Sequence, residues 1–178
     1  MCFEIEAKLK VDSLQEVKEK LMQLGAEFLG ERVQIDYHFD DADGTMAKND
    51  RCLRLRQQKS GEKEQFFLTY KGPKEKSNFK KRQEIEIEIE DADSLQKLLS
   101  ALGYEMALSV EKKRQPWKYG GCEVALDELP LLGNFVEIEG PGEEEIANVQ
   151  ESLGLADLLH IPKSYAHLTK DELSRRNA

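Results

Sequence analysis

The chain has 178 residues, of which 39% are hydrophobic, so it can bury one good core as a single domain over residues 1–178. Lys and Arg total 26 against 35 Asp and Glu, and the net charge of -9 argues against nucleic acid or an anionic membrane as a partner. The three cysteines include no CxxC pair, which indicates neither a disulfide framework nor a zinc site and fits a cytoplasmic protein.

The chain opens with MCFEIEAKLKV, which alternates as a β-strand does. One face would carry Phe3, Ile5, Ala7, Leu9 and Val11, and the other would carry Glu4, Glu6, Lys8 and Lys10. For a single half-buried strand, the simplest interpretation of the charged face is contact with water. The strand pattern starts without a secretory leader, and no apolar run reaches the ~20 residues of a membrane span, so we expect no membrane association.

The segment VDSLQEVKEKLMQLGAE predicts an amphipathic helix, with Ser13 and Glu16 as a capping box and LG as its C-terminal end. The order of strand, DSLQ and helix recurs in EIEIEIEDADSLQKLLSALGYE. We therefore predict an internal duplication of strand–helix units near residues 1–40 and 80–118. A C-terminal helical segment is expected over residues 143–178.

Seven further segments alternate in hydrophobicity and are separated by turn-rich sequences such as DADGTMAKND and KGPKEKSN. They span residues 31–40, 51–58, 64–72, 80–90, 106–118, 122–128 and 134–139. With the first strand they give about eight strands, joined largely by hairpins.

Nearly every predicted strand combines an apolar face with a charged face. Arg and Lys repeat on one face in RCLRLRQQ and VEKKRQPW, whereas Glu repeats in KKRQEIEIEIE and NFVEIEG. A closed antiparallel barrel with its apolar faces outward, covered by three amphipathic helices, would collect these charges in its interior. Charges in such an interior must be paired with one another or matched to a ligand.

Two interpretations of these charges remain open from the residues alone. The first is a structural network of ion pairs. The second is a metal–triphosphate site, because Arg and Lys bind phosphate oxygens and carboxylates bind Mg²⁺ or Mn²⁺. The candidate cations are Lys8, Arg54, Arg56, Lys71, Arg82, Lys112 and Arg114. The candidate metal ligands are Glu4, Glu6, Asp127, Glu137 and Glu139.

These segments resemble, in order, the motifs of the CYTH superfamily, the triphosphate tunnel metalloenzymes. The similar sequences span nearly the whole chain and are FEIEAKLKV, QIDYHFDD, LRLR, LTYKGP, RQEIEIEIE, EKKRQPW, EVALDELPLLGNFVEIEG and KSYAHL. The resemblance implies an α+β fold, namely a closed eight-stranded antiparallel β-barrel, or tunnel, with amphipathic helices packed outside it. It also implies that the seven cations hold the triphosphate and that the five carboxylates bind the metal directly or through water.

The resemblance also suggests catalytic residues. Lys8 would position or activate the nucleophile. In several triphosphatases of the family a Tyr on the second strand assists this Lys, but in QIDYHFDD the matching position is His38, and Tyr37 has the opposite parity. His38 is therefore the second candidate catalytic residue.

Three functions follow from the resemblance. The first is conversion of ATP to cyclic AMP and pyrophosphate, as in class IV adenylate cyclases, which the compact length and the KSYAHL ending favour. The second is hydrolysis of inorganic tripolyphosphate or thiamine triphosphate. The third is a polyphosphate or nucleotide sensor without turnover, against which Lys8 and the full set of carboxylates argue. The sequence is also compatible with a homodimer.

Overall fold

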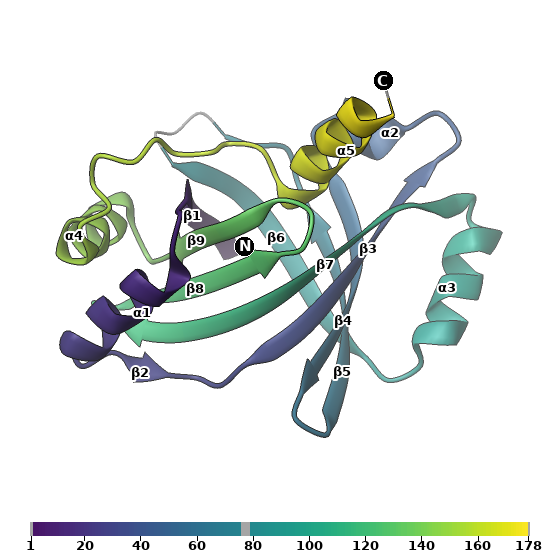
Figure 1. Ribbon diagram of the computed structural model, residues 1–178. Coiled ribbons are helices and arrows are strands. Elements are labelled where there is room, and N and C mark those ends of the chain that lie inside the picture. Colours follow the sequence, from purple (N-terminus) through teal and green to yellow (C-terminus); the bar gives the residue numbers. More distant parts are fainter. Residues whose placement is uncertain (1, 76–78, 178) are drawn as a thin grey trace.

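The computed structural model describes residues 2–75 and 79–177, and of residues 2 and 3 it describes the backbone alone (Figure 1). Its strands are β1 (Cys2–Lys10), β2 (Glu27–Phe28), β3 (Arg32–Asp41), β4 (Cys52–Ser60), β5 (Lys63–Lys71), β6 (Lys80–Ile89), β7 (Tyr104–Tyr119), β8 (Cys122–Leu129) and β9 (Gly133–Glu139). Within the described residues, eight of them form an antiparallel sheet in the order β7-β3-β4-β5-β6-β1-β9-β8, and pairing of β8 with β7 closes it into a barrel. The ninth, β2, lies outside and pairs with β7.

The predicted fold class, α+β with a closed eight-stranded antiparallel barrel, is confirmed. The strands that the sequence predicted after the first all lie within two residues of their predicted ends. This agreement arises because successive side chains on a strand point to opposite faces, and here one face is apolar and the other charged along almost every strand. Strand β2 was not predicted, because two residues are too few to show alternation.

Five helices occur in the described residues: α1 (Leu14–Gln23), α2 (Thr45–Lys48), α3 (Ala92–Ala101), α4 (Glu143–Leu153) and α5 (Tyr165–Arg176). Helix α1 begins as predicted at Ser13, whose Oγ accepts a hydrogen bond from the backbone N of Glu16 at 3.3 Å. Asp91 and Ser164 cap α3 and α5 in the same way. No helix in these parts of the chain has the length and apolar character needed to cross a membrane.

The outer face of β1, β8 and β9 packs against α1 and α4 (Figure 1). The fully buried side chains of this core are Leu9, Leu21, Val124, Val136, Ile138 and Ile146. Burial of each contributes about 1.5–3 kcal/mol to stability. Because the strand residues among them alternate with residues that face the interior, this packing fixes which side chains of the three strands point into the barrel.

Helix α3 packs against the opposite side of the barrel, where Leu99 joins Phe39 and Leu55 in a second cluster. The prediction that helices cover the outward apolar faces is wrong at β6, where Ile85 and Ile87 are each 53% exposed. The cause is the path of the chain. Helix α3 follows β6 directly but turns away from it to pack over β3, β4 and β7, so it leaves the outer face of β6 open.

Helix α5 lies at one end of the barrel (Figure 1). Its first residue, Tyr165, packs with Val110, Leu129 and Phe135. The segment before the helix is tied to β1, because Ile161 N donates a hydrogen bond to the Lys8 carbonyl oxygen at 2.8 Å. The start of α5 therefore forms part of the wall at this end of the barrel.

The predicted repeat units share one order of elements. The first reads β1, α1, then β2 and β3, and the second reads β6, α3, then β7. The predicted C-terminal helical segment contains α4 and α5, which are separated by an extended connection. An origin by internal duplication, and a single domain over the whole chain, stay predictions.

Candidate active site

A cavity of about 820 Å³ occupies the barrel interior and extends to the end covered by α5. Among the predicted site residues, Asp127 alone does not line it. The twelve that do are Glu4, Glu6, Lys8, His38, Arg54, Arg56, Lys71, Arg82, Lys112, Arg114, Glu137 and Glu139. They come from seven of the described strands, so the closed barrel brings together side chains that lie far apart in the sequence.

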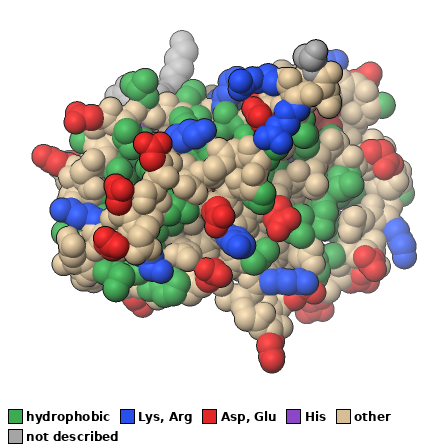
Figure 2. Space-filling view, in the orientation of Figure 1, with side chains coloured by type: hydrophobic (Ala, Val, Ile, Leu, Met, Phe, Trp, Pro, Cys, Tyr) green, Lys and Arg blue, Asp and Glu red, His purple; other side chains and the backbone are tan. Residues whose placement is uncertain are grey.

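The cavity separates the two signs of charge. Strands β6, β1, β9 and β8 form an acidic wall with Glu84, Glu86, Glu4, Glu6, Glu137, Glu139 and Glu123. Strands β7, β3, β4 and β5 form a basic wall with Arg114, Lys112, Arg32, Arg54, Arg56 and Lys71. The side chains of opposite sign on these walls are Lys8, Lys80 and Arg82 on the first, and Asp36 and Asp40 on the second. By contrast, acidic and basic side chains are interspersed on the outer face seen in Figure 2.

Lys8 is 2% exposed and lies where the acidic wall meets α5. Its Nζ is 3.2 Å from Glu137 Oε1, donates to the carbonyl oxygen of Lys163 at 3.1 Å, and lies 4.1 Å from the centre of the Tyr165 ring. Burial alone would raise the pKa of Glu137, but Lys8 and Arg114 hold it well below its usual value. Glu137 is therefore ionised and fixes the ammonium group at the cavity wall.

Asp127 is fully buried behind the basic wall. Its Oδ1 accepts a hydrogen bond from Arg114 Nε at 2.7 Å. Its Oδ2 accepts from Arg114 Nη2 at 2.5 Å, Tyr165 OH at 2.9 Å and Lys112 Nζ at 3.3 Å. Burial, and then Arg114, lowers the pKa of Lys112 to about 8. The structure thus gives Asp127 an ion-pairing role, and its predicted role as a metal ligand stays a prediction.

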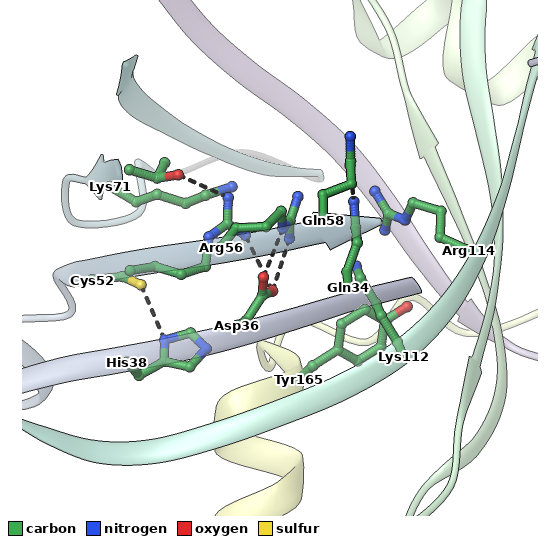
Figure 3. Close-up of polar contacts among 12 residues, drawn as sticks. Gln34, Asp36, His38, Cys52, Arg56, Gln58, Lys71, Lys112, Arg114 and Tyr165 are labelled. Atoms are coloured by element: carbon green, nitrogen blue, oxygen red, sulfur yellow. Dashed lines mark hydrogen bonds and ion pairs between the residues drawn. The ribbon is translucent and has the colours of Figure 1, made fainter. Parts of the chain in front are cut away.

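Asp36 contacts both arginines of LRLR, and Figure 3 shows it beside Arg56. Arg56 binds it through two parallel hydrogen bonds, Nε to Oδ1 at 2.6 Å and Nη2 to Oδ2 at 2.8 Å. Arg54 Nη1 is 3.5 Å from Asp36 Oδ2, and its Nη2 donates to Thr69 Oγ1 at 3.0 Å. Burial would raise the pKa of Asp36, but Arg56 and Arg54 hold it well below its usual value. This carboxylate orients both guanidinium groups before any ligand binds.

The carboxylates of β1 are paired with lysines in the same way. Lys71 Nζ lies 2.7 Å from both carboxylate oxygens of Glu4 and 2.9 Å from Glu84 Oε2. Lys80 Nζ binds Glu6 Oε1. Because Lys71 stands on the basic wall and reaches a carboxylate of the acidic wall, a bound triphosphate would compete with Glu4 for it.

Arg82 has an unused donor. Its Nη2 is 3.4 Å from Asp50 Oδ1, whereas its buried Nε has no hydrogen-bond partner among the described residues. A buried donor without a partner is unfavourable and rare in folded proteins. A phosphate oxygen in the cavity would satisfy it, so the environment of Arg82 fits an anionic ligand.

The acidic wall contains a row of three carboxylates. Glu6, Glu139 and Glu123 lie directly opposite one another on β1, β9 and β8. Burial, and then Glu4 and Glu6, raises the pKa of Glu139 to about 7. This repulsion between like charges and the oxygen ligands fit a hard divalent cation. In the described residues, however, no three such side chains lie close enough to hold a metal as they stand, so binding would need their rearrangement.

His38 lines the cavity from β3, with Nδ1 3.4 Å from Cys52 Sγ (Figure 3). Tyr37 lies on the opposite face of the strand, where its OH donates to Gln57 Oε1 at 3.2 Å. Neither side chain hydrogen-bonds to Lys8 within the described structure. His38 is therefore in the cavity but is not the direct partner of the lysine, and its catalytic role stays a prediction.

His38 should make stability depend on pH. Burial lowers its pKa from 6.5 to about 4, with Arg54 and Arg56 acting in the same direction and Asp36 opposing them. Between pH 6.5 and pH 4 the unfolded chain therefore binds a proton that the folded chain does not, so the free energy of unfolding decreases as the pH is lowered. From pH 7.5 to 4.5, urea unfolding should show the wild type losing about 2–3 kcal/mol more than His38→Gln. Equal losses would contradict this burial.

Several side chains at the site received no predicted role, among them Asp36, Lys80, Glu123 and Tyr165. The first three share a strand face with predicted site residues, so alternation was a usable signal for them. Tyr165 comes from a helix, and only its place in KSYAHL pointed to it. Burial, and then nearby carboxylates, raises its pKa well above 10, so its hydroxyl stays protonated and donates to a carboxylate.

The fold and the cavity define a tunnel protein with opposed acidic and basic walls. The CYTH domain family model matches residues 3–165. The protein named "Putative adenylate cyclase MJ0240" of Methanocaldococcus jannaschii is 32% identical over 175 residues, which are 98% of this chain and 95% of that protein. "Adenylate cyclase CyaB" of Aeromonas hydrophila is 27% identical over 183 residues, covering 97% and 91%.

Solved structures share this fold over nearly the whole chain. PH1819 of Pyrococcus horikoshii OT3 superposes with a TM-score of 0.81 at 31% identity, covering 94% of this chain and 99% of that one. HpAC1 of Hippeastrum, described as having a dominant triphosphatase activity, shares the fold with a TM-score of 0.70 at 18% identity over 94% and 95%. The chain belongs to the CYTH domain family of triphosphate tunnel enzymes.

Proposed function

We propose that the protein is a metal-dependent enzyme that acts on a triphosphorylated small molecule inside the tunnel. The observation that carries this proposal is the separation of an acidic and a basic wall around one cavity of about 820 Å³. A metal–triphosphate complex has the complementary charges, since phosphate oxygens suit Arg and Lys and the cation suits carboxylates. A purely structural network of ion pairs would explain neither this cavity nor the unused donor on Arg82.

The reaction that we propose first is conversion of ATP to cyclic AMP and pyrophosphate. The 3′-oxygen forms a bond to the α-phosphorus, the bond from that phosphorus to the bridging oxygen breaks, and the hydroxyl proton is released. Two relatives that match nearly the whole chain carry adenylate cyclase names, which supports this choice.

Each wall has a part in this reaction. On the basic wall, Arg54 and Arg56 would bind phosphate oxygens, and their shared contact with Asp36 keeps both guanidinium groups oriented. Lys8, held between Glu137 and α5, would position the nucleophile.

On the acidic wall, the predicted metal ligands that line the cavity would hold Mg²⁺ or Mn²⁺, which when bound neutralises charge on the phosphate oxygens. These ligands are Glu4, Glu6, Glu137 and Glu139. Asp127 would support the site from behind by fixing Lys112 and Arg114.

The second candidate is hydrolysis of tripolyphosphate or thiamine triphosphate, in which water attacks the terminal phosphorus. The same cations would stabilise this displacement. HpAC1 has the same fold and a described triphosphatase activity, so the fold alone does not separate the two reactions. A sensor without turnover is the third candidate, and the presence of Lys8 together with four predicted metal ligands in one cavity argues against it.

One assay separates these functions. Purified protein is given ATP, tripolyphosphate or thiamine triphosphate with Mg²⁺ or Mn²⁺, and cyclic AMP and phosphate are both measured. Cyclic AMP from ATP is the expected result. Rapid phosphate release from tripolyphosphate without cyclic AMP would replace the cyclase by a triphosphatase, and binding without product would leave a sensor.

Glu139→Gln should raise the metal concentration for half-maximal activity by about tenfold or more, by loss of a carboxylate ligand. Glu139 is the informative choice because no hydrogen bond or ion pair ties it to another described residue, so its replacement should leave the fold intact. Metal titration of activity is the measurement, with Glu88→Gln on β6 as control because Glu88 does not line the cavity. An unchanged metal requirement would remove Glu139 from the ligand set.

A further inference from the structure

Next to Arg56, the cavity wall contains three side chains without charge, and Arg32 follows them on β3. Gln34 on β3 and Gln58 on β4 face each other across the strand pair, and Phe67 on β5 lies opposite Arg56. All three line the same cavity as the predicted phosphate-binding residues. The described triphosphate site gives no role to these carboxamides and this ring.

The two carboxamides form a pair with unused hydrogen-bonding groups (Figure 3). Gln34 Nε2 donates to Gln58 Oε1 at 2.7 Å. Gln34 is 1% exposed, and its Oε1 has no hydrogen-bond partner among the described residues. Gln58 Nε2 likewise donates to no other residue in the described structure. The pair therefore offers one acceptor and one donor.

This result does not depend on which way each amide is turned. If both carboxamides are rotated by 180°, Gln58 becomes the donor of the shared hydrogen bond. The unused groups are then the amide nitrogen of Gln34 and the amide oxygen of Gln58, which again make one donor and one acceptor.

The pair lies within reach of a group attached to a bound triphosphate. Gln58 follows Arg56 by two residues on the same face of β4, a separation of about 7 Å along the strand. Gln34 lies opposite Lys112, another predicted phosphate-binding residue. A substrate whose phosphates contact Arg54 and Arg56 could thus extend its organic part to the carboxamides.

We propose that Gln34, Gln58 and Phe67 form a subsite for a heteroaromatic base with an amidine edge, so that the substrate is an organic triphosphate and not inorganic tripolyphosphate. This proposal rests on the proposed function of the tunnel. An amidine edge places an amino donor beside a ring-nitrogen acceptor, which is the pattern that a carboxamide reads in adenine. Phe67 supplies an aromatic face for stacking. Adenine and the aminopyrimidine of thiamine both have this edge.

The test compares dissociation constants, measured by calorimetry with Mg²⁺ and with EDTA. The probes are ATP, thiamine triphosphate, tripolyphosphate, and purine riboside triphosphate, which lacks only the 6-amino group of ATP. If adenine is the base, ATP should bind about tenfold more tightly than purine riboside triphosphate, as expected for one hydrogen bond to a buried acceptor. If the aminopyrimidine is the base, thiamine triphosphate should be the tightest ligand.

Gln34→Leu and Gln58→Leu should each weaken the preferred organic ligand by about tenfold and leave tripolyphosphate within about twofold. Phe67→Leu should do the same through loss of stacking. Gln57→Leu is the matched control, because Gln57 is on the same strand but its side chain bonds Tyr37 and Glu64, away from the cavity. Two independent carboxamide variants keep the test informative if one fails to fold.

Either of two results would overturn the subsite. The first is that the wild type binds tripolyphosphate and both organic triphosphates with equal affinity. The second is that both carboxamide variants lose as much affinity for tripolyphosphate as for the organic ligand. These results leave the triphosphate tunnel intact. By contrast, if none of the four probes binds the wild type in either condition, the proposed function itself fails and the subsite fails with it.

Discussion

Replacement of Lys8 by Met is expected to reduce turnover by about 10²–10⁴-fold while the barrel stays folded. The expected loss is large because the Lys8 ammonium group is buried where the acidic wall meets α5. Its Nζ is fixed there 3.2 Å from Glu137 and 3.1 Å from the Lys163 carbonyl oxygen. Glu137 keeps its contact with Arg114 in the variant, so one counter-charge remains.

The measurement is the rate of product formation at saturating substrate, together with thermal unfolding to establish that the fold persists. Lys10→Met is the matched control, since Lys10 is on the same strand face but is exposed and does not line the cavity. If Lys8→Met kept wild-type turnover, Lys8 would be left with a structural role only. If the variant bound substrate weakly but turned it over at the normal rate, Lys8 would be a binding residue.

Asp127→Ala is expected to lower the free energy of unfolding by about 3–5 kcal/mol. The carboxylate has no exposed surface and accepts hydrogen bonds from Arg114, Lys112 and Tyr165. Its removal would leave two neighbouring buried cations with Glu137 as their close counter-charge.

Urea unfolding in EDTA measures this effect without any contribution from a bound metal. Glu128→Ala is the control, because Glu128 is the adjacent residue on β8 and is exposed. A bound polyanion should restore part of the lost stability, since it supplies negative charge to the same cations. A loss of stability that appeared only in the presence of metal would instead favour the predicted ligand role of Asp127.

Much of the fold could be predicted because, along almost every strand, apolar residues repeat on one face and charged residues repeat on the other. Ile85, Ile87 and their neighbours alternate with Glu, and the same alternation of apolar and charged residues identified the other barrel strands. Each charged face must point either to water or to the interior, and a closed barrel is the arrangement that would collect these charges inside. The resemblance to the CYTH motifs implied the same fold. The position of twelve predicted site residues in one cavity is a consequence of this geometry.

Which charges pair with one another could not be predicted, because alternation gives the face of a residue but not its neighbours across the strand. Asp36 meets Arg56 only through the register of β3 with β4. Asp127 shares a strand face with Glu123, yet Glu123 lines the cavity whereas Asp127 is covered by Arg114 and its neighbours. The role of a charged residue depends on such contacts, which the pattern of one strand does not contain.

Helix positions were hard to predict for a similar reason. The apolar stripe of α3 shows that it packs against something, but not that it turns away from β6 and leaves Ile85 and Ile87 exposed. Likewise, nothing in the periodicity of the last helix indicates that Tyr165 lies over Lys8.

The pairing of β1 with β9 has a consequence for folding kinetics. It sets Glu6 opposite Glu139 and Lys8 opposite Glu137, so the acidic wall is complete only after the two ends of the barrel sequence have met. Contacts between residues so distant in the chain slow the folding of β-rich domains. An intermediate in which the hairpins of β3 to β6 have formed would already hold Arg54 and Arg56, but of the acidic wall it would contain only the β6 carboxylates and would lack those of β1, β8 and β9. Recovery of metal-dependent activity during refolding should therefore lag behind recovery of β-sheet circular dichroism.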